Sequence, residues 1–187
     1  MEKSLSEMTL EELWELFPIF LTEHNKEWES WYLEEEKRIK SFLPEVEKLK
    51  INHIGSTAID GICAKPIIDI LLEIPAACSM KEFKDVLVSH GYICMSEDEN
   101  RISFNRGYTQ KGFAEKVFHL HLRYWGDNDE ISFRDYMRDN PEAAKKYEEL
   151  KLSLWKKYEH NRDGYTNAKT SFILEHTTKA KNQEKNR

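Results

Sequence analysis

Hydrophobic and polar residues alternate most clearly between positions 67 and 74, and this alternation predicts a β-strand. Side chains two residues apart in a strand share a face. One face of this strand is therefore wholly apolar, whereas the other combines apolar residues with two acids. The apolar face has Ile68, Ile70, Leu72 and Ile74, and the mixed face has Ile67, Asp69, Leu71 and Glu73.

Asp69 is the residue of this strand that most needs an explanation. A carboxylate in mid-strand loses hydration energy unless it is paired, solvated or bound to a cation. Its position indicates either a wet functional cleft or a sheet face that is half exposed, as antiparallel sheets often are. The sequence leaves both interpretations open.

A second strand is predicted over residues 117–125, where polar and apolar residues again alternate. If it lies beside the first strand, its two histidines face the same cleft as Asp69. One histidine is usually a structural hydrogen-bonding residue, but two beside an acid-bearing strand favour a functional site. The polar face has Val117, His119, His121 and Arg123, and the apolar face has Phe118, Leu120, Leu122 and Tyr124.

The remaining pattern predicts one domain over residues 1–178. Helical periodicity places N-terminal helices at 9–43 and C-terminal helices at 131–178, on either side of a core at 50–125. The residues from 179 to 187 are polar, and we expect them to form a frayed tail.

Three details of the predicted helices can be checked against a structure. Glu35 lies in the apolar stripe of a helix over 25–42, which favours an ion-paired acid over a ligand contact. Asn140 is a plausible N-cap, with Pro141 at the first helical position. The last helix is predicted over 165–176.

Composition indicates a folded cytoplasmic protein. The chain has 187 residues, of which 40% are hydrophobic, and a formal net charge of -6 that comes from its first 50 residues. No basic region predicts nucleic-acid binding. Three cysteines without CxxC spacing indicate a reducing compartment, and no apolar run is long enough to span a membrane. The oligomeric state is not indicated.

Six motifs carry a family resemblance and follow one another from the helix at Trp28 to the helix at Phe172. They are His-Ile-Gly-Ser-Thr-Ala (53–58), Lys-Pro-Ile-Ile-Asp-Ile (65–70), His-Leu-His (119–121), Phe-Arg-Asp-Tyr-Met-Arg (133–138), Pro-Glu-Ala-Ala (141–144) and Tyr-Thr-Asn-Ala-Lys (165–169). In these residues the chain resembles the GrpB family. GrpB proteins are similar to the nucleotidyltransferase superfold of DNA polymerase beta and kanamycin nucleotidyltransferase. The resemblance implies an α+β fold with a mixed β-sheet of about five strands, helices packed on one face, and further N- and C-terminal helices.

The resemblance also implies a nucleotide site. In the superfold, a Gly-Ser pair is followed by acids that hold Mg²⁺ or Mn²⁺, and Gly55, Ser56 and Asp69 match this pattern. Glycine lets the backbone approach phosphate, serine donates a hydrogen bond, and the metal offsets charge that develops during transfer. The implied catalytic residues are Asp69 and Glu73, and the implied nucleotide-binding residues are Gly55, Ser56, Thr57, Lys65, Arg134 and Lys169.

The sequence departs from the superfold pattern at two places. Leu71 stands where the second acid is expected, and Glu73 lies two residues farther along the strand, roughly 7 Å away. His119 and His121 stand on the strand expected to carry the third acid. Imidazole suits Zn²⁺, Fe²⁺, Mn²⁺ or Ni²⁺ better than Mg²⁺.

Three functional hypotheses follow from these residues. The first is an enzyme that transfers a nucleotidyl group from a nucleoside triphosphate to an unknown acceptor, with a divalent metal on Asp69. The second is a regulatory module that binds a nucleotide or another anionic small molecule without chemistry. The third is a transition-metal enzyme whose ligands are Asp69, His119 and His121. Structural roles are the alternative for single residues, such as a solvated turn at Lys65 or an Arg134–Asp135 ion pair.

Overall fold

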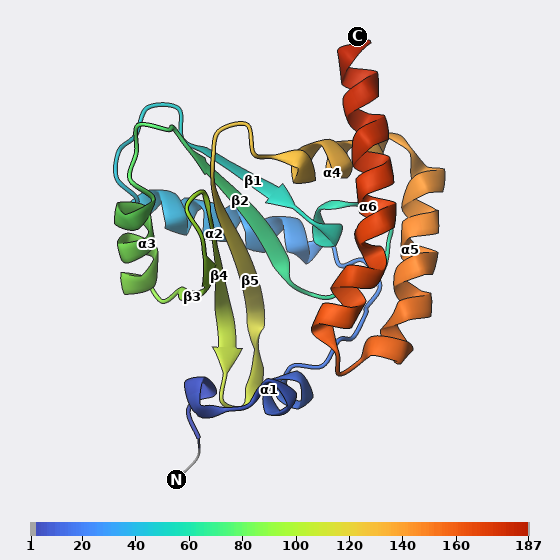
Figure 1. The fold of residues 1–187 in the computed structure, drawn as a ribbon, viewed down its shortest axis with the longest axis horizontal. Helices are drawn as coiled ribbons and strands as arrows, with labels where there is room; N and C mark the ends of the chain where they lie inside the picture. Colours follow the sequence, from blue (N-terminus) through green and yellow to red (C-terminus); the bar gives the residue numbers. More distant parts are fainter. Residues whose placement is uncertain (1–2, 187) are drawn as a thin grey trace.

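The computed structural model describes residues 3–186, whose strands form one five-stranded mixed sheet (Figure 1). The strand order is β1-β2-β5-β4-β3. Strands β2 and β5 run parallel, and the other neighbours are antiparallel. This arrangement confirms the predicted α+β fold and the predicted adjacency of the two alternating strands. The strands are β1 (Lys50–Ile54), β2 (Ile68–Ile74), β3 (Ile93–Glu97), β4 (Arg101–Thr109) and β5 (Gly112–Tyr124).

Helices α2 (Glu27–Phe42) and α3 (Met80–Ser89) cover the apolar face of the sheet (Figure 1). The start of helix α3 is capped by Ser79, whose Oγ accepts from the backbone N–H of Glu82. Burial of apolar surface is the main source of stability here. The main core cluster on this face includes Trp28, Ile39, Ile68, Ile70, Leu72, Ile74, Phe83 and Leu87.

The C-terminal helices lie beyond β1, away from α3 (Figure 1). They are α4 (Asp129–Asp139), α5 (Pro141–Trp155) and α6 (Arg162–Lys185). A second apolar cluster joins them to the segment that follows β1. Its buried members are Ile59, Ile62, Phe133, Met137, Ala144 and Tyr147.

The N-terminal helix α1 (Leu10–Leu16) lies beneath the turn that joins β4 to β5 (Figure 1). Its start forms a capping box, in which Glu12 N–H donates to Thr9 Oγ1 and Thr9 N–H donates to the Glu12 carboxylate. Short 3₁₀ helices complete the described elements at Leu5–Glu7, Ser56–Ala58 and Lys156–Tyr158.

Glu35 is an ion-paired structural acid, as predicted. Its side chain is buried in α2 and accepts from Arg38, Arg106 and the Tyr92 hydroxyl. Burial alone would raise the pKa of Glu35, but the hydrogen bonds and charges of these partners lower it overall. The carboxylate therefore ties α2 to strand β4 and to the residue that precedes β3.

The end of the chain differs from the prediction. Helix α6 begins at Arg162 and continues to Lys185, through the stretch that was expected to fray. Ala180 is buried there, and Lys181 forms an ion pair with Asp129 of α4. Tertiary packing on α4 therefore holds a helical segment that is too polar to be predicted as one.

Asn140 occupies the predicted N-cap position of α5, with Pro141 first in the helix, but its side chain makes no capping bond. Its amide instead donates to the carbonyl of Tyr136 in α4. None of the described helices combines the length and apolarity needed to cross a bilayer. Cys63, Cys78 and Cys94 are free thiols.

Candidate functional site

Asp69 and the two histidines form one polar cluster on the face of the sheet opposite α2. In the parallel register of β2 and β5, Asp69 lies opposite His119, and Leu71 lies opposite His121. The Asp69 Oδ1 atom is 3.2 Å from His119 Nδ1 and 3.9 Å from His121 Nε2. The predicted cleft therefore exists, and the strand alternation located it.

Gly55 brings the loop after β1 directly against this carboxylate. Its φ is +73° and its ψ is -172°, a backbone region that is essentially limited to glycine and costs other residues on the order of 1–3 kcal/mol. A Cβ atom at this position would overlap Asp69 Oδ2. Glycine is therefore required twice, for its backbone conformation and for the close approach to Asp69.

His119 uses both ring nitrogens in the polar cluster. Nδ1 faces Asp69, and Nε2 is 2.8 Å from the Tyr108 hydroxyl. Burial lowers the pKa of His119 although Asp69 favours its charged form. The bonds are satisfied by a neutral imidazole that donates from Nδ1 and accepts at Nε2. Burial would raise the pKa of Asp69, but its contacts with the two histidines hold that pKa well below the usual range.

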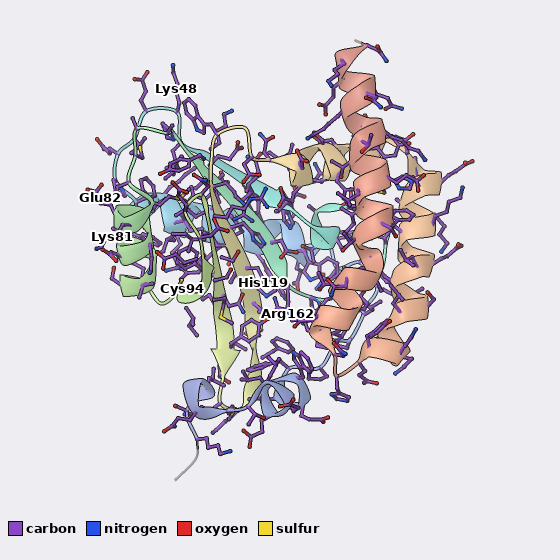
Figure 2. All side chains as sticks on the ribbon, in the orientation of Figure 1. Lys48, Lys81, Glu82, Cys94, His119 and Arg162 are labelled. Carbon is purple, nitrogen blue, oxygen red and sulfur yellow. The ribbon has the colours of Figure 1, made fainter. Side chains whose placement is uncertain are left out.

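A cavity of about 210 Å³ opens beside Asp69 and is strongly basic. Strand β2 and the Gly55 loop form one wall, and helices α5 and α6 form the other. Figure 2 shows Arg162 at the start of α6 and His119 on the sheet. The polar and charged residues that line the cavity are Ser56, Thr57, Lys65, Asp69, His119, Lys151, Arg162, Tyr165, Thr166 and Lys169.

The cations of this basic cavity are held close together without acidic partners. Among the described residues, no ion pair joins Lys65, Lys151, Arg162 or Lys169 to a carboxylate. Burial, and to a smaller extent the nearby charge of Arg162, lower the pKa of Lys65 to about 7. Burial also lowers the pKa values of Lys151, to about 7, and of Lys169, to about 8. The cluster is therefore short of negative charge.

Tyr165 adds an unpaired polar group to the basic cavity. Only 6% of the residue is exposed, and its hydroxyl makes no hydrogen bond within the described part of the chain. Leaving a buried hydroxyl without a partner costs roughly 1–3 kcal/mol. An acceptor on a ligand in this cavity would remove that cost.

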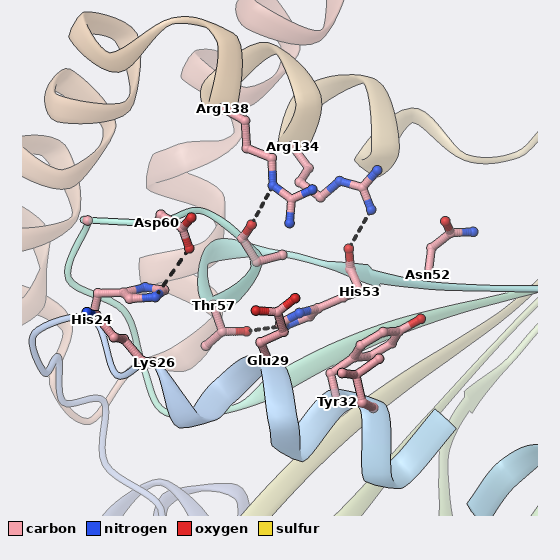
Figure 3. A pocket seen from close by; sticks show the side chains of 13 residues that line it. His24, Lys26, Glu29, Tyr32, Asn52, His53, Thr57, Asp60, Arg134 and Arg138 are labelled. Atoms are coloured by element: carbon pink, nitrogen blue, oxygen red, sulfur yellow. Dashed lines mark hydrogen bonds and ion pairs between the residues drawn. The ribbon is translucent and has the colours of Figure 1, made fainter. Parts of the chain in front are cut away.

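Two predicted nucleotide-binding residues have structural partners. The Thr57 hydroxyl donates to the Ile67 carbonyl and lies 3.0 Å from His53 Nε2, so it fixes the loop while lining the basic cavity. Arg134 lies elsewhere, in a larger cavity of about 760 Å³ between α2, β1 and α4 (Figure 3). It donates to the His53 carbonyl on the outer edge of β1 and pairs with Asp135.

The structure also separates Glu73 from Asp69. Glu73 is fully buried at the far end of β2, where Oε1 accepts from Gly126 N–H and from the Asn128 side chain. Leu71 is fully buried between the two acids. Of the predicted set, the structure brings together Gly55, Ser56, Thr57, Lys65, Asp69, His119, His121 and Lys169, and it places Glu73 and Arg134 apart from them.

These residues do not fit the paired-carboxylate metal site of the superfold. In the described part of the chain, no group of three or more His, Cys, Asp or Glu side chains is arranged to hold a metal ion. Asp69 is the one carboxylate on the basic cavity, whose four cations would repel a divalent metal. His119 would have to give up an existing hydrogen bond to act as a ligand.

Sequence reasoning missed Lys151 as a site residue. Ala144, Tyr147, Glu148 and Lys151 are buried at helical spacing in α5, so a cation lies in the inward stripe of that helix. The same signal identified Glu35 in α2. Tyr165 lies at the start of the predicted last helix, but its sequence position does not indicate the unpaired hydroxyl.

Comparisons with known proteins identify relatives of the whole domain. The family model for "GrpB protein" matches residues 18–179. The glutamate-rich protein GrpB of Alkalihalophilus pseudofirmus is 36% identical over 163 residues, which cover 84% of this chain and 92% of that protein. The UPF0157 protein YqkA of Bacillus subtilis is 34% identical over 168 residues, which cover 88% of this chain. The match spans about half of YqkA, at 48% of its length.

Solved structures give the same picture of the fold. The conserved protein GrpB from Enterococcus faecalis superposes with a TM-score of 0.75 and 26% identity, over 88% of this chain and 99% of that one. The Cid1 poly(U) polymerase with Mg 3′-dATP bound superposes with a TM-score of 0.50 and 10% identity, over 85% of this chain and 51% of that one. The second likeness shows a nucleotidyltransferase-like fold and nothing further.

Proposed function

The chain belongs to the GrpB family, and we propose that it binds the phosphate groups of an anionic small molecule, such as a nucleoside triphosphate, in the basic cavity beside Asp69. The single observation that carries this proposal is the cluster of Lys65, Lys151, Arg162 and Lys169 around one cavity. Burying unpaired cations costs free energy, and a bound polyanion offsets that cost.

The other groups of the cavity match what a phosphate needs. Gly55 keeps the loop backbone close to Asp69, and Ser56 follows with a hydroxyl that can donate to phosphate. The unpaired Tyr165 hydroxyl is a further donor. Arginine and lysine side chains are the usual protein partners of phosphate oxygens.

Nucleotidyl transfer is the finer activity that the fold suggests. Asp69 is the single superfold carboxylate that faces the cavity, and Leu71 replaces its partner. Binding of a phosphate-bearing small molecule is therefore the function that the geometry supports best, and Asp69 would orient the loop and His119 in it. A two-histidine, one-carboxylate metal enzyme finds no specific support, because His119 already uses both nitrogens.

Isothermal titration calorimetry with inorganic triphosphate and the four common nucleoside triphosphates, with and without Mg²⁺, tests this proposal. We expect binding without Mg²⁺, together with a rise in thermal stability, because a ligand selective for the folded state stabilises it by mass action. Lys169→Gln should weaken binding at least tenfold. Lys179→Gln, on the exposed surface of the same helix, is the matched control and should leave binding unchanged.

Failure of all five ligands to bind would refute the proposal. Transfer is measured separately, as release of pyrophosphate from each nucleoside triphosphate in the presence of Mg²⁺ or Mn²⁺. If the protein releases pyrophosphate and the Asp69→Asn variant does not, the function of the site is catalysis rather than binding alone.

A further inference from the structure

A second cavity of about 260 Å³ adjoins the basic cavity and has the opposite character. It is lined by helix α1, the edge of β3 and the side chain of Tyr108. Figure 1 shows α1 below the turn between β4 and β5. The wall of this cavity is almost wholly apolar. The apolar side chains that line it are Leu5, Leu10, Leu13, Trp14, Phe17, Ile93 and Met95.

The two cavities share the side chains of Lys65 and Arg162, which line both. The strand register independently indicates that the two cavities are neighbours. Residues that pair directly across neighbouring strands share one face of the sheet, and one such row joins the two cavities. In that row Asp69 lies opposite His119, His119 opposite Asn105, and Asn105 opposite Ile93. A molecule that lies along this row therefore passes from a charged site to an apolar one.

Asn105 marks the boundary between the two cavities. Only 3% of the residue is exposed, and its amide Nδ2 makes no hydrogen bond within the described residues, although it lines the apolar cavity. A buried amide donor without a partner is costly unless a ligand supplies an acceptor. With the Tyr165 hydroxyl, each cavity thus offers one unpaired donor.

The rim of the apolar cavity is unusually exposed. Leu10 is 51% exposed, Ile93 44% and Met95 52%, although all three border one cavity. Contiguous apolar surface on a folded protein commonly marks a binding site. The side chains that would gain most from contact with a ligand therefore lie next to the cations that would hold its charge.

We propose that the two cavities form one site for a phosphate ester of a largely apolar group. The phosphate lies among Lys65, Arg162 and Lys169, and the apolar group lies under α1 with its one hydrogen-bond acceptor at Asn105. This inference rests on phosphate binding in the basic cavity and adds the chemical class of the attached group. Apart from Lys65 and Arg162, which would hold the phosphate, Asn105 is the unpaired donor of this cavity, and such a wall suits a group with few polar atoms better than a base with a fully polar edge.

A series of alkyl phosphates tests the proposal. Affinities of inorganic phosphate and of ethyl, butyl and hexyl phosphate are measured by calorimetry on the full chain. Each methylene that enters the apolar cavity should increase affinity up to about fourfold, so hexyl phosphate should bind at least tenfold more tightly than ethyl phosphate. Hexanol, which lacks the phosphate, should not bind.

Substitutions on the exposed rim locate the effect without disturbing the core. Leu10→Ser and Met95→Ser should each reduce the gain from ethyl to hexyl phosphate severalfold and leave inorganic phosphate unaffected. Leu33→Ser is the matched control, because Leu33 is 52% exposed and borders the cavity of Figure 3 instead.

Equal affinities across the alkyl series, with inorganic phosphate bound, would overturn this inference and leave the proposed phosphate site standing. A gain that Leu33→Ser reduces as much as Leu10→Ser would also overturn it. Absence of binding by every phosphate, including inorganic triphosphate, would overturn both proposals together.

Discussion

Affinity for a polyphosphate should fall as the pH rises, because the free protein loses protons from lysines that the bound form needs charged. The pKa of Lys65 is about 7 and that of Lys169 about 8. A bound phosphate favours the ammonium form and raises both pKa values, so binding takes up protons. The sign follows directly: deprotonation competes with binding, and affinity decreases through this pH window.

The size of the effect follows from the two pKa values. Between pH 7.0 and 8.5, linkage predicts a loss of about 16-fold from Lys65 and about fourfold from Lys169, on the order of 60-fold together. The last ionisation of an esterified phosphate lies at about pH 6, so the charge of a nucleoside triphosphate changes little over this range. At pH 7.5 about one proton should be taken up per ligand from these two groups.

Calorimetric titration of the nucleoside triphosphate that binds most tightly, at constant ionic strength, measures both quantities. Buffers with different ionisation enthalpies give the number of protons bound. Lys65→Arg should reduce the loss of affinity over this pH range by about 16-fold, because arginine stays charged throughout. Lys151 also has a pKa of about 7, but its ammonium already donates to the Cys63 carbonyl, so we expect it to contribute little to the pH dependence of binding. Lys179→Arg should leave the profile unchanged. Affinity that is constant or rises from pH 7.0 to 8.5 would refute the reasoning.

Three further predictions concern stability and are measured by chemical denaturation. Gly61→Ala should lower the free energy of unfolding by about 1–2 kcal/mol, because Gly61 has a positive φ. Gly55→Ala should lower it by about 1–3 kcal/mol more, because the new Cβ also overlaps Asp69. Equal losses in the two variants would contradict the close approach of Gly55 to Asp69. Glu35→Gln should cost about 3 kcal/mol, since it leaves two arginines without their buried acid, and the exposed Glu34→Gln should cost less than about 1 kcal/mol. The unfolding free energy of the free protein should rise between about pH 7.5 and 9.5, because the unfolded chain keeps protons on lysines that the folded state has released; a fall over this range would show that these lysines stay charged in the cavity.

The strand pairing and the cleft could be predicted because both depend on a period of two. Alternation in residues 67–74 and 117–125 assigns each side chain to a face, so the neighbouring strands had to place Asp69 near the two histidines. The apolar faces of α2 and α3 follow in the same way from helical spacing. An alternating pattern predicts the strand register well, because a shift of one residue would turn the buried side chains to solvent.

The second wall of the site could not be predicted in this way. Lys151 reaches the Cys63 carbonyl, 88 residues earlier in the chain. Its position in an inward stripe is visible in the sequence, but the element that the stripe faces depends on how α5 lies against the sheet. Arg134 shows the converse, because α4 lies along the edge of β1 and brings that guanidinium to the His53 carbonyl. Arg134 belongs to one of the family motifs, but it does not line the basic cavity.

Leu71 stands where the superfold has its second acid, and the charges around Asp69 explain why this difference is compatible with the rest of the site. Metal-dependent phosphate sites hold Mg²⁺ jointly through carboxylates and the substrate phosphates, and therefore need acids near the phosphates. Here four cations face a single carboxylate, and the position of the second acid is fully buried. A carboxylate at position 71 would lose its hydration without gaining a metal, and its charge would offset the cations that a phosphate requires. The phosphates would therefore be neutralised by lysine and arginine side chains, which is why the binding proposed for this cavity does not depend on Mg²⁺.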